Sequence, residues 1–131
     1  MSHPRRMPLL TDPWFAATFY GNVSADDRSR QEIPSIDGAQ GVQLWCPCGY
    51  GDPRYPLSGG RPHMLMIPFR NPRNAPPCPE NHGMLQKGNH DAPRPRWVMS
   101  GTGLADLTVH PSVDVGDPSC WHGWIQGGEV R

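Results

Sequence analysis

Four residues with the side chains of a metal site occur in two tight pairs. Cys46 and Cys48 are separated by one residue, and Cys120 and His122 repeat this spacing far downstream. Zinc binds thiolate and imidazole groups in a tetrahedron, and structural zinc sites use four protein ligands. Side chains at positions i and i+2 of a strand point to the same face. The spacing therefore predicts one structural zinc site held by Cys46, Cys48, Cys120 and His122.

Two other residues compete for the place of the fourth ligand. Cys78 lies in a proline-rich stretch and His110 directly precedes a proline. Either can replace His122, although a free thiol is the simpler role for Cys78. Buried thiols are the plain alternative to a metal site. A disulfide between Cys46 and Cys48 is disfavoured, because it would be strained and because disulfides are rare inside cells.

The sequence gives less support to a catalytic role for the same residues than to a structural metal site. A catalytic zinc needs an open coordination position and a general base. Zinc deaminases carry an H-x-E motif followed by P-C-x-x-C, and this sequence has neither. A nucleophilic pair of Cys120 with His122 or His110 is formally available. Because ligands adjacent in one strand argue against such a pair, no catalytic residue is predicted.

Composition indicates a small domain whose hydrophobic core needs a further source of stability. The 131 residues allow one domain, and they include 17 Pro and 15 Gly. Such a content approaches the range of disordered chains, whereas five Trp argue against disorder. A loop-rich domain of this size commonly relies on a staple, and a metal ion is one of the usual staples.

The charge balance excludes some partners. The sequence has twelve basic and twelve acidic residues, so it lacks the basic excess of a nucleic-acid-binding protein. No apolar run reaches the ~18 residues of a membrane span. The N-terminus lacks the apolar core of a signal peptide. We therefore expect a cytosolic protein that binds neither nucleic acid nor membranes.

Short strand patterns dominate the chain after residue 40. Alternating or apolar runs bounded by Gly and Pro predict strands, and Gly127-Gly128 predicts a hairpin turn. Pro111 is expected to interrupt one of the runs. Few helix signals occur, which predicts a mainly β fold: a small, loop-rich antiparallel sheet or sandwich stapled by zinc. The expected strands cover residues 41–48, 63–69, 96–100, 107–110, 112–115, 121–126 and 129–131.

The chain divides into an arm and a domain. Residues 1–40 are predicted to form an irregular N-terminal arm, and residues 41–131 a zinc-stapled β-domain. A proline-rich insertion loop at about 70–95 interrupts this domain, and loops of that length are often functional. The apolar residues 14–20 of the arm either contact a partner or pack on the domain. The sequence leaves both alternatives open.

Three sequence elements carry a resemblance to a known family. These are the C-P-C-G element at Cys46, the P-S-V element at Pro111, and the C-x-H-G-aromatic-I-x-x-G-E-V element that begins at Cys120. Together, over about 42–50 and 62–131, the chain resembles small proteins of unknown function that are common in phages and prophages. The resemblance implies a phage origin and a metal-binding β-domain.

These observations favour a non-enzymatic role. We expect a zinc-binding phage accessory protein that acts as a protein-interaction module, with a viral or host protein as partner. A structural virion component, whose arm and loop bind neighbouring subunits, is the first alternative and would place the protein in the virion. A zinc-dependent hydrolase or deaminase-like enzyme is the second alternative.

Overall fold

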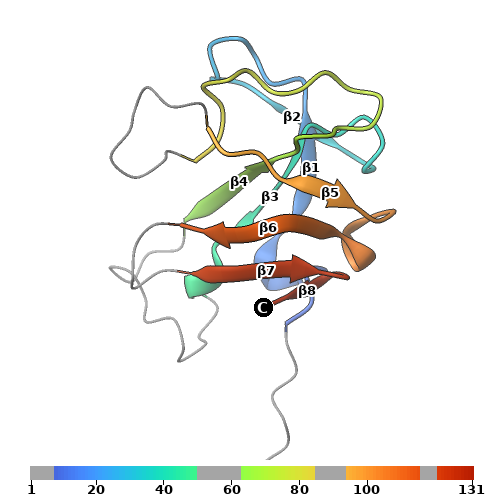
Figure 1. The fold of residues 1–131 in the computed structure, drawn as a ribbon, viewed down its shortest axis with the longest axis vertical. Helices are drawn as coiled ribbons and strands as arrows, with labels where there is room; N and C mark the ends of the chain where they lie inside the picture. Colours follow the sequence, from blue (N-terminus) through green and yellow to red (C-terminus); the bar gives the residue numbers. More distant parts are fainter. Residues whose placement is uncertain (1–7, 50–62, 85–93, 116–120) are drawn as a thin grey trace, which may run out of the picture.

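The computed structural model describes residues 8–49, 63–84, 94–115 and 121–131. Over these ranges the fold is mainly β, as the sequence predicts, and two four-stranded antiparallel sheets form it (Figure 1). The strands and short 3-10 helices (η) are η1 (Pro13–Phe15), β1 (Thr18–Gly21), β2 (Gln31–Ile33), β3 (Gly41–Trp45), η2 (Pro47–Gly49), β4 (Met64–Pro68), β5 (Val98–Ser100), η3 (Leu104–Asp106), β6 (Thr108–Asp114), β7 (His122–Gln126) and β8 (Glu129–Val130).

The first sheet has the strand order β2-β1-β3-β4. Its strands β3 and β4 pair antiparallel along their whole length. Val42 and Leu44 alternate along β3 and have no exposed surface, which is the period-two pattern of a half-buried strand. Cys46 follows β3 and His63 precedes β4. The loop end of this hairpin therefore brings a thiol and an imidazole together.

The second sheet has the order β5-β6-β7-β8, and each strand pairs with its neighbour in the sequence. The turn between β7 and β8 is the predicted Gly127-Gly128 pair, whose φ angles of 55° and 79° lie in the left-handed region that favours glycine. A Cβ atom on Gly128 would lie 2.1 Å from the carbonyl oxygen of Ala105. Gly128 is therefore required by the hairpin, and Gly127 is favoured by its left-handed backbone.

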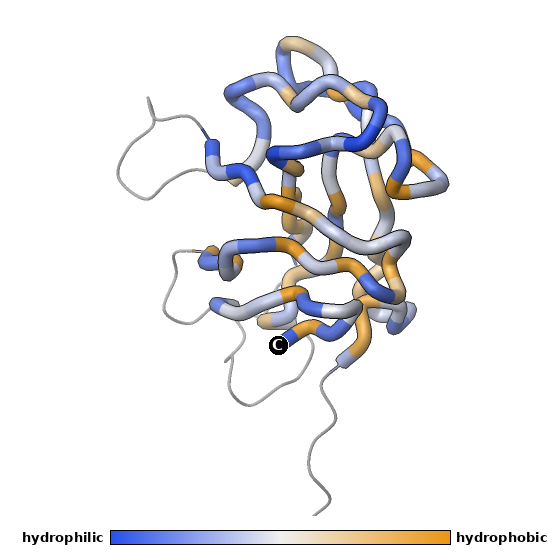
Figure 2. Tube along the Cα trace, turned by 45° about the vertical axis from the view of Figure 1, so that its right-hand side comes forward, coloured by the Kyte–Doolittle hydropathy of each residue, from blue (hydrophilic) through white to orange (hydrophobic). Residues whose placement is uncertain are grey.

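One isolated bridge joins the two sheets, and a second joins the N-terminal segment to the second sheet. Phe69, just after β4, bridges Trp97, just before β5, and Leu9 bridges Glu129 of β8. Apolar residues lie along strands of both sheets (Figure 2), and they form one core cluster. The largest fully buried side chains of this core are Trp121, Tyr20, Phe15, Phe69, Leu10, Leu44, Ile67, Leu107, Ile125, Val42, Val109 and Val113.

The N-terminal segment is built into the fold. β1 lies between β2 and β3 in the first sheet. Leu10 and Phe15 have no exposed surface, and Tyr20 is 1% exposed. The described part of residues 1–40 therefore differs from the predicted irregular arm. The sequence leaves two alternatives open for these apolar side chains, and the structure shows that they pack inside the chain, where the common core removes them from water.

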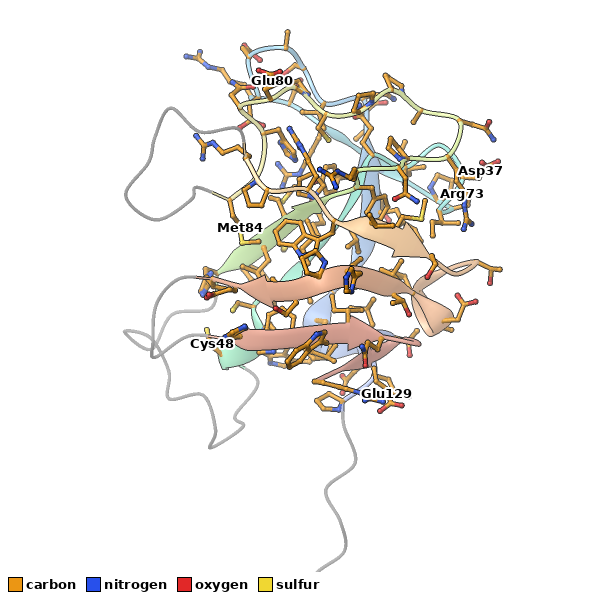
Figure 3. All side chains as sticks on the ribbon, in the orientation of Figure 1. Asp37, Cys48, Arg73, Glu80, Met84 and Glu129 are labelled. Atoms are coloured by element: carbon orange, nitrogen blue, oxygen red, sulfur yellow. The ribbon has the colours of Figure 1, made fainter. Side chains whose placement is uncertain are left out.

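Two proline-containing regions have different structures. Pro111, which is predicted to break a strand, lies inside the continuous strand β6, with a cis His110–Pro111 peptide bond. The described part of the proline-rich stretch, 70–84, contains no strand. A bridge between Asp37 and Arg73, which lie side by side in Figure 3, ties it to the connection between β2 and β3. No helix among the described residues has the length and apolar character needed to cross a membrane.

Candidate functional site

Cys46, Cys48 and His63 form a cluster of metal-ligand side chains within the described ranges. Their ligand atoms all lie within 4.8 Å of one another. Cys48 Sγ lies 3.3 Å from His63 Nε2. Both cysteines are buried and His63 is half-buried. Two thiols and an imidazole suit zinc and other metals that accept soft ligands, so this cluster can hold a metal ion.

The β3–β4 hairpin explains how these ligands meet. The Cys46 amide donates a hydrogen bond of 2.8 Å to the His63 carbonyl, which extends the strand ladder by one step. The chain then turns through η2, where the Gly49 amide donates to the Cys46 carbonyl at 3.1 Å. This tight turn returns Cys48 to the same place. Cys48 lies on the left in Figure 3, the side on which β7 begins.

The structure bears on the four predicted zinc ligands in different ways. The structure brings Cys46 and Cys48 together and adds His63, which the sequence analysis does not single out. Cys120 lies outside the described residues. His122 is the exposed first residue of β7, and its imidazole lies near a serine hydroxyl. Its role as a metal ligand stays a prediction.

A serine and a histidine meet on the outer face of the second sheet. Ser112 Oγ on β6 and His122 Nε2 on β7 are 3.5 Å apart. Ser112 is half-buried and His122 is exposed. A hydroxyl beside an imidazole nitrogen is the nucleophile–base arrangement of acyl transfer, and such distances often shorten when substrate binds. The pair can therefore generate a reactive serine that substrates can approach.

A bulge in β6 determines the position of Ser112. The strand register shifts between Val109 and Val113, so the stretch His110–Ser112 lies opposite the single residue Trp124 of β7. Bulges of this kind often lie next to active sites, where they redirect a side chain. The Trp97 indole nitrogen donates a hydrogen bond of 3.2 Å to the Ser112 carbonyl. This bond anchors the bulged backbone to a buried side chain.

Two neighbours surround the His122 imidazole. The Trp124 ring stacks on it, with centroids 6.2 Å apart and an interplanar angle of 22°. Asp114 is the cross-strand partner of His122, and both residues are exposed. Side chains directly opposite each other in antiparallel strands have Cβ atoms about 5 Å apart. The carboxylate of Asp114 is therefore placed to influence the orientation of the imidazole.

A second histidine belongs to a buried hydrogen-bonded chain. His82 Nε2 lies 2.7 Å from the Tyr20 hydroxyl, and His82 Nδ1 contacts the Asp27 carboxylate. The carboxylate selects the Nδ1-protonated tautomer, so the Tyr20 hydroxyl donates to Nε2. The His82 side chain is only 4% exposed. Burial raises the pKa of the Tyr20 hydroxyl well above its ordinary value, which keeps that group protonated.

Cys78 lies beside this chain and is a buried free thiol. Its Sγ donates to the Gln40 carbonyl at 3.7 Å. Burial raises the pKa of the Cys78 thiol to about 11, so the thiol is protonated at neutral pH and is a poor nucleophile. Neither Cys78 nor the exposed His110 belongs to the cysteine–histidine cluster found among the described residues.

Comparison with known proteins finds a match to one family model, over part of the chain. Residues 72–131 match a family model described as bacterial ubiquitination-like system serine protease (BubE). The matched stretch is a little under half of the chain and contains Ser112, His122 and Asp114. It begins well after Cys46 and Cys48, which therefore lie outside it. No curated protein and no solved structure matches the chain.

Sequence reasoning misses two residues of these sites for different reasons. His63 stands fifteen residues after Cys48 with no recognisable spacing, and only the pairing of β3 with β4 brings it to the cysteines. Ser112 belongs to the P-S-V element, which is a visible signal. Its partner His122 is ten residues away, and the histidine is first interpreted as a metal ligand because Cys120 lies beside it.

Proposed function

We propose that this protein is a serine hydrolase that cleaves protein conjugates or precursors in a bacterial ubiquitination-like system. One observation carries the proposal: Ser112 Oγ and His122 Nε2 lie 3.5 Å apart on an exposed sheet face. The description of the family model that matches residues 72–131, a serine protease of such a system, supports the same chemistry. The partner is then a protein substrate, in agreement with the protein partner expected from the sequence.

The reaction follows from the two side chains. His122 Nε2 accepts the proton of the Ser112 hydroxyl while Oγ attacks the substrate carbonyl carbon, which forms a tetrahedral oxyanion. When this intermediate collapses, the bond to the leaving group breaks and His122 donates its proton to that group. Water then attacks the acyl-serine with His122 again acting as the base. Asp114 orients the imidazole and stabilises its charged form.

Labelling with a fluorophosphonate probe tests this proposal, because the probe reacts with activated serines. Mass spectrometry should locate the adduct on Ser112. Ser112→Ala and His122→Ala should lower the labelling rate at least about a thousandfold. Ser100→Ala and His110→Ala are matched controls, since both residues are exposed on neighbouring positions of the same sheet. An adduct elsewhere, or equal labelling of Ser112 in His122→Ala, would contradict the proposal.

The cysteine–histidine cluster has a structural role in this proposal. Zinc is the metal that best suits two thiolates and an imidazole in a closed site. We assign Cys120 as the fourth ligand in place of the predicted His122, and His122 acts as the base. Cys120 directly precedes Trp121, a core residue that leads into β7. A ligand at this position would fasten the start of β7 to the β3–β4 hairpin.

Elemental analysis of the freshly purified protein tests the metal assignment. We expect about one equivalent of zinc, and loss of most of it in Cys48→Ser and Cys120→Ser. Because structural zinc contributes ~10–16 kcal/mol in small zinc peptides, these variants should also unfold easily. Cys78→Ser is the control and should retain its metal. Full zinc content in His63→Ala would remove His63 from the ligand set.

A non-enzymatic interaction module is the second candidate, because a domain held by the buried cysteines Cys46 and Cys48 needs no catalytic residue. Buried ligands suit a structural metal rather than a catalytic one. In this case the protein would be a phage or prophage accessory protein, or a virion component, that binds a protein partner. A zinc-loaded protein in which Ser112 fails to react with the probe would favour this candidate over the hydrolase.

A further inference from the structure

The surroundings of Ser112 restrict how a substrate can bind. β6 is an interior strand, paired with β5 on one side and β7 on the other. Strand addition to β6 is therefore blocked at Thr108–His110, where β5 pairs with it, and the Ser112 carbonyl already accepts a hydrogen bond from the Trp97 indole. Recognition next to the nucleophile must rely on side chains that project from the outer face of this sheet.

Two exposed apolar side chains flank the nucleophile. Leu9, Val98 and Trp124 are the exposed large hydrophobic residues of the described ranges, at 54%, 43% and 44% exposure. Trp124 lies opposite the bulge that carries Ser112. Val98 pairs with His110 at the other side of the same bulge. Exposed apolar side chains gathered at one place indicate a binding surface.

The placement of Trp124 gives it a particular role. One face of its indole stacks on the imidazole of His122, and the ring is still 44% exposed. The indole therefore stands as an apolar wall beside the reacting atoms. We propose that Trp124 is a specificity-determining residue, and that it selects substrates with an apolar group next to the scissile carbonyl. This inference rests on the proposed hydrolase function.

A pair of esters tests the inference on the full-length, metal-loaded protein. The kcat/KM ratio of p-nitrophenyl hexanoate to p-nitrophenyl acetate measures the preference for an apolar acyl group. Trp124→Ala should lower this ratio about tenfold, because the longer chain loses the apolar area that the indole covers. Trp124→Phe should largely restore it. Leu9→Ala, which removes an exposed apolar side chain beside β8, should leave the ratio unchanged.

The outcomes separate this inference from the proposed function. An equal decrease of both kcat/KM values in Trp124→Ala would show that the indole only positions His122, and would overturn the specificity role. A wild-type protein without preference for the hexanoate would overturn it as well. If neither ester is hydrolysed faster by wild type than by Ser112→Ala, the hydrolase function itself fails, and the inference fails with it.

Discussion

His82 and His122 each lie beside a hydroxyl group, and their surroundings differ in nearly every other respect. His82 is 3% exposed, and its two nitrogens contact Tyr20 and Asp27. His122 is exposed at the start of β7, and its Nε2 lies 3.5 Å from Ser112. The buried chain has the shorter hydrogen bond to its hydroxyl, at 2.7 Å.

The comparison shows that hydrogen-bond geometry alone does not identify a reactive centre. An acid, a histidine and a hydroxyl in a row resemble a catalytic triad. Tyr20 is 1% exposed, however, so no substrate carbonyl can reach its hydroxyl. The chain instead satisfies polar groups that would be costly to bury alone. The looser pair on the outer face has access to substrate, and that is where chemistry is expected.

Exchanging each histidine for alanine should separate the two roles most strongly. His82→Ala leaves a cavity and a buried Tyr20 hydroxyl without a partner, so we expect the free energy of unfolding to fall by about 3 kcal/mol. His122→Ala should change it by no more than about 0.5 kcal/mol, as is usual at exposed positions. Urea denaturation of both variants measures the difference. Equal destabilisation would break the comparison.

Removing the hydroxyl groups should give the same contrast on a smaller scale. Tyr20→Phe leaves His82 Nε2 buried without its hydrogen bond, and we expect a loss of about 1–2 kcal/mol in unfolding free energy. Ser112→Ala should be neutral within about 0.5 kcal/mol, although it should abolish labelling by the fluorophosphonate. A Tyr20→Phe protein as stable as wild type would mean that the buried hydrogen bond contributes little.

The dependence of stability on pH should sharpen the description of the buried region. The Cys78 thiol has its pKa raised from 9.0 to about 11 by burial. As the pH rises above 9, the unfolded chain releases this proton before the folded chain does, so stability falls between about pH 9 and 11. Cys78→Ser should show a shallower decrease than wild type in urea denaturation at pH 8, 9 and 10. Parallel curves would contradict the burial of a protonated thiol.

Local pattern in the sequence predicts much of the fold. The alternation of apolar residues at 41–45 predicts β3, and Gly127-Gly128 predicts the β7–β8 turn, because each depends on neighbours in the chain. The spacing of Cys46 and Cys48 also predicts that the two thiols meet, but the turn of η2 brings them together and not the face of a continued strand. In contrast, the burial of Leu10, Phe15 and Phe19 depends on packing into the common core, so the sequence alone leaves their role open.

Contacts between distant segments are decided only by the tertiary structure. His63 joins the two cysteines because β3 and β4 pair in one particular register. Ser112 meets His122 because the register of β6 against β7 shifts at the bulge, and a shift of one residue would turn either side chain to the other face. Burial is decided in the same way. The sequence supplies six histidines of equal chemistry, and the packing of the two sheets encloses His82 and leaves His122 in contact with solvent.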